Sequence, residues 1–109
     1  MKKDSAAVAE RRGATRVAGP LDGFTAGHRP IRISDLSVTG CFVETMEAVA
    51  SGDAIDLQIQ IPNWGLLPLQ GQVAYTSAPF GFAVHFMNVR ADTQIVLQAA
   101  VEALAGRRL

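Results

Sequence analysis

The chain has 109 residues, which is the size of one domain, and 49% of them are hydrophobic, so a packed core is expected. Its formal net charge is zero, and no apolar run is long enough to span a bilayer. The single cysteine, Cys41, cannot form an internal disulfide, which is typical of a reducing compartment, so we expect a cytoplasmic protein without a membrane partner. Two isolated histidines and one cysteine lack the spacing of metal ligands and predict no metal site.

The charges are unevenly distributed along the chain. Residues 1–32 hold seven Lys or Arg against three acids, whereas residues 33–89 hold five acids and no base. Arg11, Arg12 and Arg16 lie within six positions of one another. This asymmetry predicts an anionic partner at the N-terminal end, but the body has no basic stripe, so we expect no DNA or RNA partner.

The chain begins with a polar, Ala-rich segment, and we expect residues 1–9 to form a flexible arm ahead of one domain over residues 10–109. Turn residues cluster at 19–23 and 26–30, and the segment between Arg16 and Asp35 is poor in strand formers. A first strand there is expected to be short or bulged, with an open register. After it, Ile31 and Ile33 alternate with a polar residue, as in a half-buried strand.

The middle of the chain predicts a series of short antiparallel strands. Strands are expected at 41–45, at 54–61 and at 69–76, with a hairpin connection over 62–68. After a turn at 77–81, a further strand is expected over 82–87. The side chains expected to point inward on the last two strands are Leu69, Val73, Tyr75, Phe82, Val84 and Phe86.

The C-terminal segment has the pattern of a helix over roughly 93–105, capped by Asp92 and ended by Gly106. Its apolar face would consist of Val96, Leu97, Ala100, Val101 and Leu104. Five or six short strands followed by one helix predict a small antiparallel β-barrel whose open end or flank the helix covers.

Two short motifs carry chemistry. Arg12 and Arg16 fit R-x-x-x-R, and Asp35, Ser37 and Gly40 fit D-x-S-x-x-G between two apolar strands. With the later segments "PLQGQVAYT" and "FGFAVHF", the chain resembles the PilZ domain, a bacterial receptor module for cyclic di-GMP, over roughly residues 10–105.

This resemblance implies a mainly β fold, a six-stranded antiparallel β-barrel with a C-terminal α-helix, and a ligand, cyclic di-GMP, without a cofactor or catalysis. It implies that Arg12 and Arg16 contact guanine and phosphate, and that Asp35 and Ser37 contact bases. Gly40 becomes the turn residue, and it would allow a positive φ or a close backbone approach where the ligand sits. Arg11, just before the first motif, bears on whether one ligand or an intercalated pair is bound, and a third guanidinium there favours the pair.

The residue types suit that ligand. An arginine fork can form two hydrogen bonds with guanine O6 and N7 or stack on the base, which a lysine cannot do. The opposite guanine edge carries N–H donors and needs a carboxylate acceptor such as Asp35. Output would go to an unidentified downstream protein, from a monomer or a weak homodimer.

Other interpretations stay open. The arginine cluster fits a solvated charged tail, and Asp35 to Gly40 fit a turn between strands, a role compatible with binding. A nucleotide-independent protein-interaction adaptor would use Trp64 or the last helix. A hydrolase built on Ser37, His85 and Asp35 has no nucleophile elbow to support it, and Cys41 is expected to be a small buried residue.

Overall fold

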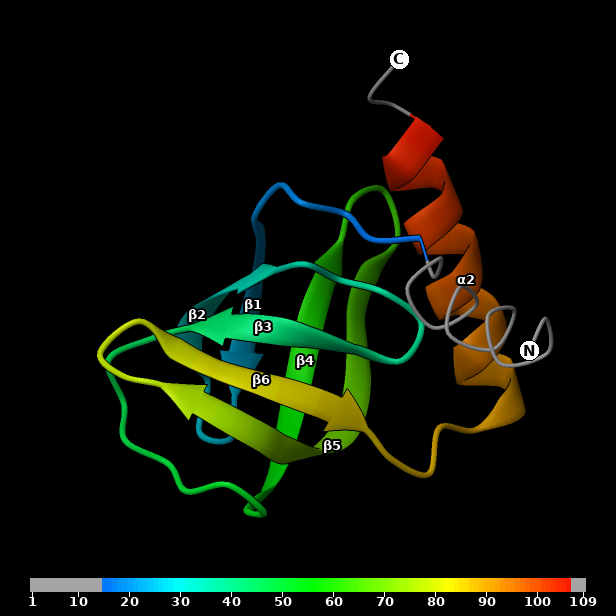
Figure 1. Cartoon of the computed structure of the whole chain (residues 1–109). Coiled ribbons are helices and arrows are strands. Elements are labelled where there is room, and N and C mark those ends of the chain that lie inside the picture. The colour runs from blue at the N-terminus through cyan, green and yellow to red at the C-terminus, as the bar shows by residue number, and fades with distance from the viewer. Residues whose placement is uncertain (1–14, 107–109) are drawn as a thin grey trace, which may run out of the picture.

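The structure, a computed structural model, describes residues 15–106 and consists there of six strands and one helix (Figure 1). The elements in chain order are β1 (Leu21–Thr25), β2 (Arg29–Ser34), β3 (Gly40–Glu44), β4 (Ala54–Ile61), β5 (Gly65–Ser77), β6 (Gly81–Phe86) and α2 (Ala91–Gly106).

The six strands close into an antiparallel barrel in the order β1-β2-β3-β6-β5-β4. Closure occurs where β1 pairs with β4, with Gly23 opposite Ile59. A closed barrel has no edge strand with unpaired backbone N–H and C=O groups, so even the short strands have a neighbour on each side. The predicted barrel with a C-terminal helix is therefore confirmed.

Strand β4 follows the predicted alternation: Leu57, Ile59 and Ile61 are buried and the residues between them face outward. The hairpin connection is shorter than expected, because β5 begins at Gly65 and pairs with β4 from there onward. Pro68 does not end the strand. Pairing between β5 and β6 starts only at Gly71, so β5 has a single neighbour at Pro68, where a missing N–H is tolerated.

The first strand occupies residues that the sequence marked as a turn. Residues 21–23 belong to β1, and the turn lies at 26–28, where Gly27 and His28 have positive φ. Gly23 is needed for packing, since a Cβ there would lie 2.6 Å from the carbonyl oxygen of Gln58 on β4. A glycine selected for close strand approach was thus misread as a turn signal.

Tyr75 was expected to point inward, and this prediction is wrong: its side chain is 58% exposed. The register between β5 and β6 shifts between Val73 and Tyr75, as a β-bulge does. A bulge adds one residue to the strand and reverses the alternation beyond it, so Val73 is buried and Tyr75 is not.

The core lies inside the barrel and continues under the helix. Ile33, Val43, Ile59 and Phe82 are at most 1% exposed. The helix adds its buried residues Leu97, Ala100 and Val101, while Val96 and Leu104 are partly buried, which confirms its predicted apolar face. Figure 1 shows α2 lying beside the barrel after the linker that follows β6.

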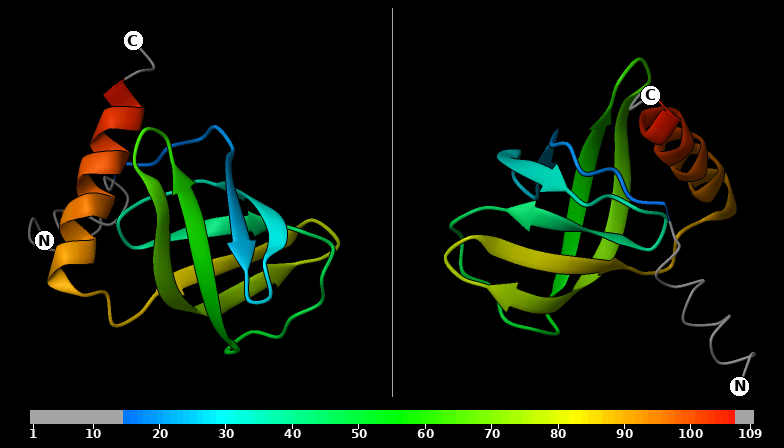
Figure 2. Two further views of the ribbon diagram at one scale, coloured as in Figure 1. Left: turned by 180° about the vertical axis from the view of Figure 1, so that it is seen from behind. Right: turned by 45° about the horizontal axis from the view of Figure 1, so that its top comes forward.

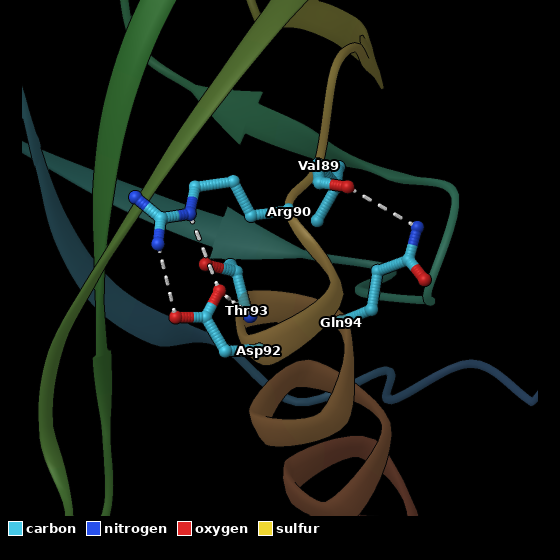
Figure 3. Close-up of polar contacts among 5 residues, drawn as sticks. All are labelled: Val89, Arg90, Asp92, Thr93 and Gln94. Atoms are coloured by element: carbon cyan, nitrogen blue, oxygen red, sulfur yellow. Dashed lines mark hydrogen bonds and ion pairs between the residues drawn. The ribbon is translucent and has the colours of Figure 1, made fainter.

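The helix begins two residues earlier than expected. The backbone N–H of Gln94 donates to the carbonyl of Arg90 (2.8 Å), so the helix starts at Ala91 and Asp92 lies inside its first turn. Figure 3 shows Asp92 with its partners: it accepts from the N–H of Thr93 (2.8 Å) and pairs with Arg90 (3.4 Å). A carboxylate there still stabilises the positive end of the helix dipole. No helix in the described part of the chain is long and apolar enough to cross a membrane.

Candidate functional site

The D-x-S-x-x-G motif forms the connection between β2 and β3. Asp35 follows the end of β2 with a φ of 49°, in the left-handed region that aspartate tolerates better than most residues, and its side chain is exposed. The next residue, Leu36, is fully buried. This alternation fixes the connection to the core through Leu36 and leaves the Asp35 carboxylate at the surface.

Val17, the residue that follows Arg16, pairs with this connection through an isolated β-bridge. The N–H of Val17 donates to the carbonyl of Leu36 (2.8 Å), and the N–H of Leu36 donates to the carbonyl of Val17 (3.2 Å). Because the bridge is antiparallel, Arg16 lies opposite Ser37. The structure therefore brings Arg16, which is exposed, to the residues of the second motif. Arg11, Arg12 and the expected arm over residues 1–9 lie outside the described residues.

Ser37 stabilises the turn itself. It is 5% exposed, and its Oγ accepts from the N–H of Thr39 (3.2 Å) and lies 3.1 Å from the Thr39 hydroxyl. Its backbone N–H donates to the carbonyl of Gly40 (2.9 Å). The turn role expected for this serine is confirmed. The Ser37 hydroxyl could bond to a ligand only if these local hydrogen bonds rearranged.

Gly40 was expected to allow a positive φ or a close backbone approach where the ligand sits; its φ is not positive, and the close approach in the structure is that of strand β6. Gly40 is the first residue of β3 and lies opposite His85 of β6. A Cβ at this position would overlap the carbonyl oxygen of Val84. The glycine is thus required by the approach of β6, and it also leaves the outer surface without a side chain at this point.

The nucleophile interpretations find no geometric support. Cys41 is buried, and burial raises the pKa of its thiol to about 12, so its thiolate is scarce at neutral pH. His85 is exposed, as expected. Within residues 15–106 no group of three His, Cys, Asp or Glu side chains is placed to hold a metal ion.

A groove of about 630 Å³ lies elsewhere on the barrel and was not predicted from the sequence. Its floor is formed by outward residues of β4 and β5, and its walls by the β1–β2 turn and the linker before α2. None of its lining residues belongs to the β2–β3 connection. Figure 2 shows β4 and β5 in front when the molecule is seen from behind, whereas β3 and β6 are in front in Figure 1. No periodic signal marks such a groove, because it arises from the curvature of the closed sheet.

The described residues define a small closed antiparallel β-barrel with a C-terminal helix. The sequence matches the PilZ domain family over residues 10–103, and the chain belongs to this family. A search of curated proteins found no match.

Solved structures with the same fold agree. The chain is similar to YcgR from Escherichia coli, solved in complex with c-di-GMP (TM-score 0.72, 19% identity, 90% of this chain and 47% of that chain). It is also similar to the inhibitor of motility MotI/DgrA from Bacillus subtilis (TM-score 0.70, 16% identity, 90% of this chain and 51% of that chain). An uncharacterized Legionella protein matches with a TM-score of 0.59 and 19% identity, over 83% of this chain and 90% of that chain. The chain spans about half the length of the first two, and at these identities the likeness establishes the fold.

Proposed function

We propose that this chain is a cyclic di-GMP receptor that binds its ligand at the face formed by Arg16 and the β2–β3 connection. The observation that supports the proposal is the bridge between Val17 and Leu36. This bridge brings Arg16, the last residue of the arginine motif, close to Asp35 and Ser37. Family membership and the ligand in the YcgR structure support the choice of nucleotide.

The surface chemistry suits a guanine and a phosphate side by side. The Arg16 guanidinium can grip guanine O6 and N7 with two hydrogen bonds or pair with a phosphate. The Asp35 carboxylate is exposed, and it can accept hydrogen bonds from the N–H donors on the opposite edge of a guanine. Ser37 and Gly40 stabilise the turn that follows Asp35.

In this proposal the arginine segment that follows the arm supplies the remaining cations. Arg11 and Arg12 would close over the ligand as it binds, and the change in exposed surface would signal to a partner protein. Arg11 favours an intercalated pair of ligands over a single one. The protein acts by binding rather than by catalysis, in the cytoplasm, where a lone buried thiol such as Cys41 stays reduced.

Calorimetric titration of cyclic di-GMP, at physiological salt and with GTP as a comparison ligand, tests the proposal. We expect binding by the wild type and a loss of about 5- to 150-fold in affinity for Arg16→Ala, as for one bidentate arginine. Asp35→Asn is the second variant, because asparagine also tolerates a positive φ. Arg90→Ala removes an exposed arginine at the helix start and is the matched control. Equal affinity in Arg16→Ala and Arg90→Ala would reject the site.

A second candidate function is a nucleotide-independent adaptor with the same fold. Trp64 on the β4–β5 turn is 56% exposed, and Ile95 on the outer face of α2 is 70% exposed. Exposed aromatic and apolar side chains of this kind anchor protein partners. A partner captured equally with and without cyclic di-GMP, and lost in Trp64→Ala, would favour this alternative.

A further inference from the structure

A histidine on β6 faces outward directly beside the candidate site. Val84 and Phe86 are buried, so the side chain of His85 between them points to the outer surface of the barrel. Across the ladder, His85 lies opposite Gly40 of β3 on one side and Gln72 of β5 on the other. The D-x-S-x-x-G motif therefore ends at the position next to this imidazole.

The motif and β6 are fixed to one another by backbone contacts. The N–H of Phe86 donates to the carbonyl of Thr39 (2.9 Å), and the N–H of Ser37 donates to the carbonyl of Gly40 (2.9 Å). Gly40 and His85 are paired residues of neighbouring strands, whose backbones lie roughly 5 Å apart. Arg16 lies opposite Ser37, so Arg16 and His85 flank the connection from its two sides.

The outward residues around His85 differ in size. Gly40, opposite His85 on β3, has no side chain, whereas Ala83, the neighbour of His85 on the same face of β6, lies between Phe42 of β3 and Tyr75 of β5. Within residues 15–106 the imidazole of His85 forms no hydrogen bond or ion pair, and the same holds for the side chains of Arg16 and Asp35. Three polar side chains thus lie around the two ends of the motif without a hydrogen-bond partner among the described residues.

We propose that His85 is a further ligand contact, donating an imidazole N–H to a phosphate oxygen of the nucleotide held by Arg16 and Asp35. This inference rests on the proposed function. A neutral imidazole has one N–H donor and a cationic one has two, so either form can bind a phosphate oxygen. Gly40 has no side chain, so the side of the ring that faces β3 and the end of the motif is left free for a ligand.

The proposal is tested by titrating cyclic di-GMP into four variants. His85→Ala removes the ring and is expected to weaken binding by about tenfold, as for a hydrogen bond to a charged group. His85→Gln keeps an N–H donor at similar reach and is expected to recover most of the affinity. His85→Phe keeps a ring without a donor and is expected to bind as weakly as His85→Ala. His28→Asn is the control, because it removes the other histidine, which lies in the β1–β2 turn. Asparagine accepts the positive φ of that position.

The outcomes separate this inference from the function on which it rests. If the wild type binds, Arg16→Ala does not and His85→Ala equals the wild type, then the His85 contact is rejected and the receptor function stands. If His85→Phe binds well and His85→Gln poorly, the ring stacks rather than donates, and the phosphate contact is rejected. If the wild type binds no cyclic di-GMP, both proposals fail. Unchanged thermal unfolding of the His85 variants shows that the affinity loss is local, as expected for an exposed side chain.

Discussion

Val17 and Leu36 exchange both backbone hydrogen bonds, at 2.8 and 3.2 Å, although 19 positions separate them in the chain. Both side chains are buried, at 7% and 0% exposure, so the bridge is part of the core as well as of the backbone network. The bridge brings Arg16, the last residue of the first motif, close to the second motif, since Arg16 precedes Val17 and Asp35 and Ser37 flank Leu36.

Truncation of Leu36 tests whether this link supports both stability and binding. Leu36→Ala leaves a cavity at a fully buried site and is expected to lower the free energy of unfolding by about 2–5 kcal/mol. Urea denaturation measures this change, and titration of the folded variant should show weaker cyclic di-GMP binding, because Arg16 loses its fixed position. Val38→Ala, at a 41% exposed neighbour, is the control and should change stability by less than about 0.5 kcal/mol. Equal stability of the two variants would contradict the account.

Substitution of Gly40 tests the close approach of β3 and β6. In Gly40→Ala the new methyl group overlaps the carbonyl of Val84, so the strands must separate, at an expected cost of about 1–3 kcal/mol in unfolding free energy. Chemical denaturation checks this value. Gly19→Ala is the matched variant, because a Cβ there meets nothing within 4 Å. A Gly40→Ala protein as stable as the Gly19→Ala protein would show that β6 does not require glycine at this position.

The buried thiol of Cys41 predicts a particular pH dependence. Burial raises its pKa to about 12 in the folded protein, above the ordinary value of 9.0, so the unfolded thiol ionises first. The resulting stabilisation is complete below pH 9 and is lost as the pH rises from about 9 to about 12, by at most about 1.4 kcal/mol per pH unit.

Two measurements check this prediction. The free energy of unfolding should fall more steeply above pH 9 in the wild type than in Cys41→Ala, which lacks the group. Iodoacetamide should label the native protein far more slowly at pH 8 than the urea-unfolded protein, since the thiolate is the reactive form. Rapid labelling of the native protein would show that Cys41 is accessible and ionised.

The proposed closing of the arginine segment over the ligand predicts that the bound nucleotide protects this segment from trypsin. Trypsin cleaves after arginine, and Arg11, Arg12 and Arg16 would each lie against the ligand in the complex. Cyclic di-GMP should therefore slow cleavage at these three bonds, as followed by mass spectrometry, while cleavage after Arg90 proceeds at the rate of the free protein. Ligand binding without any change in the cleavage rate at these three bonds would show that the arginine segment does not contact the ligand.

Much of the fold follows from local pattern. The alternation in β4 and β6 and the apolar face of α2 are set by which side chains must be buried, so the sequence predicts them. Gly23 and Tyr75 were misread because their positions depend on neighbouring strands, through a close approach at one and a bulge at the other. These features arise from tertiary pairing and leave no periodic trace.

The site divides in the same way. Asp35, Ser37 and Gly40 were located by their spacing, and the turn that they form is present. The pairing of Val17 with Leu36 and the position of His85 beside Gly40 come from strand register, which the uncertain first strand left open. The groove over β4 and β5 could not be predicted, because its walls come from segments far apart in the chain.

Mapping of ligand-induced changes in backbone amide NMR signals tests the central claim most directly. The account predicts that cyclic di-GMP shifts the signals of residues 16–17 and 35–40, together with His85, and leaves those of the groove residues 56–58, 69 and 70 unchanged. Shifts confined to the groove, or no shifts at saturating ligand, would contradict the assignment of this face as the cyclic di-GMP site.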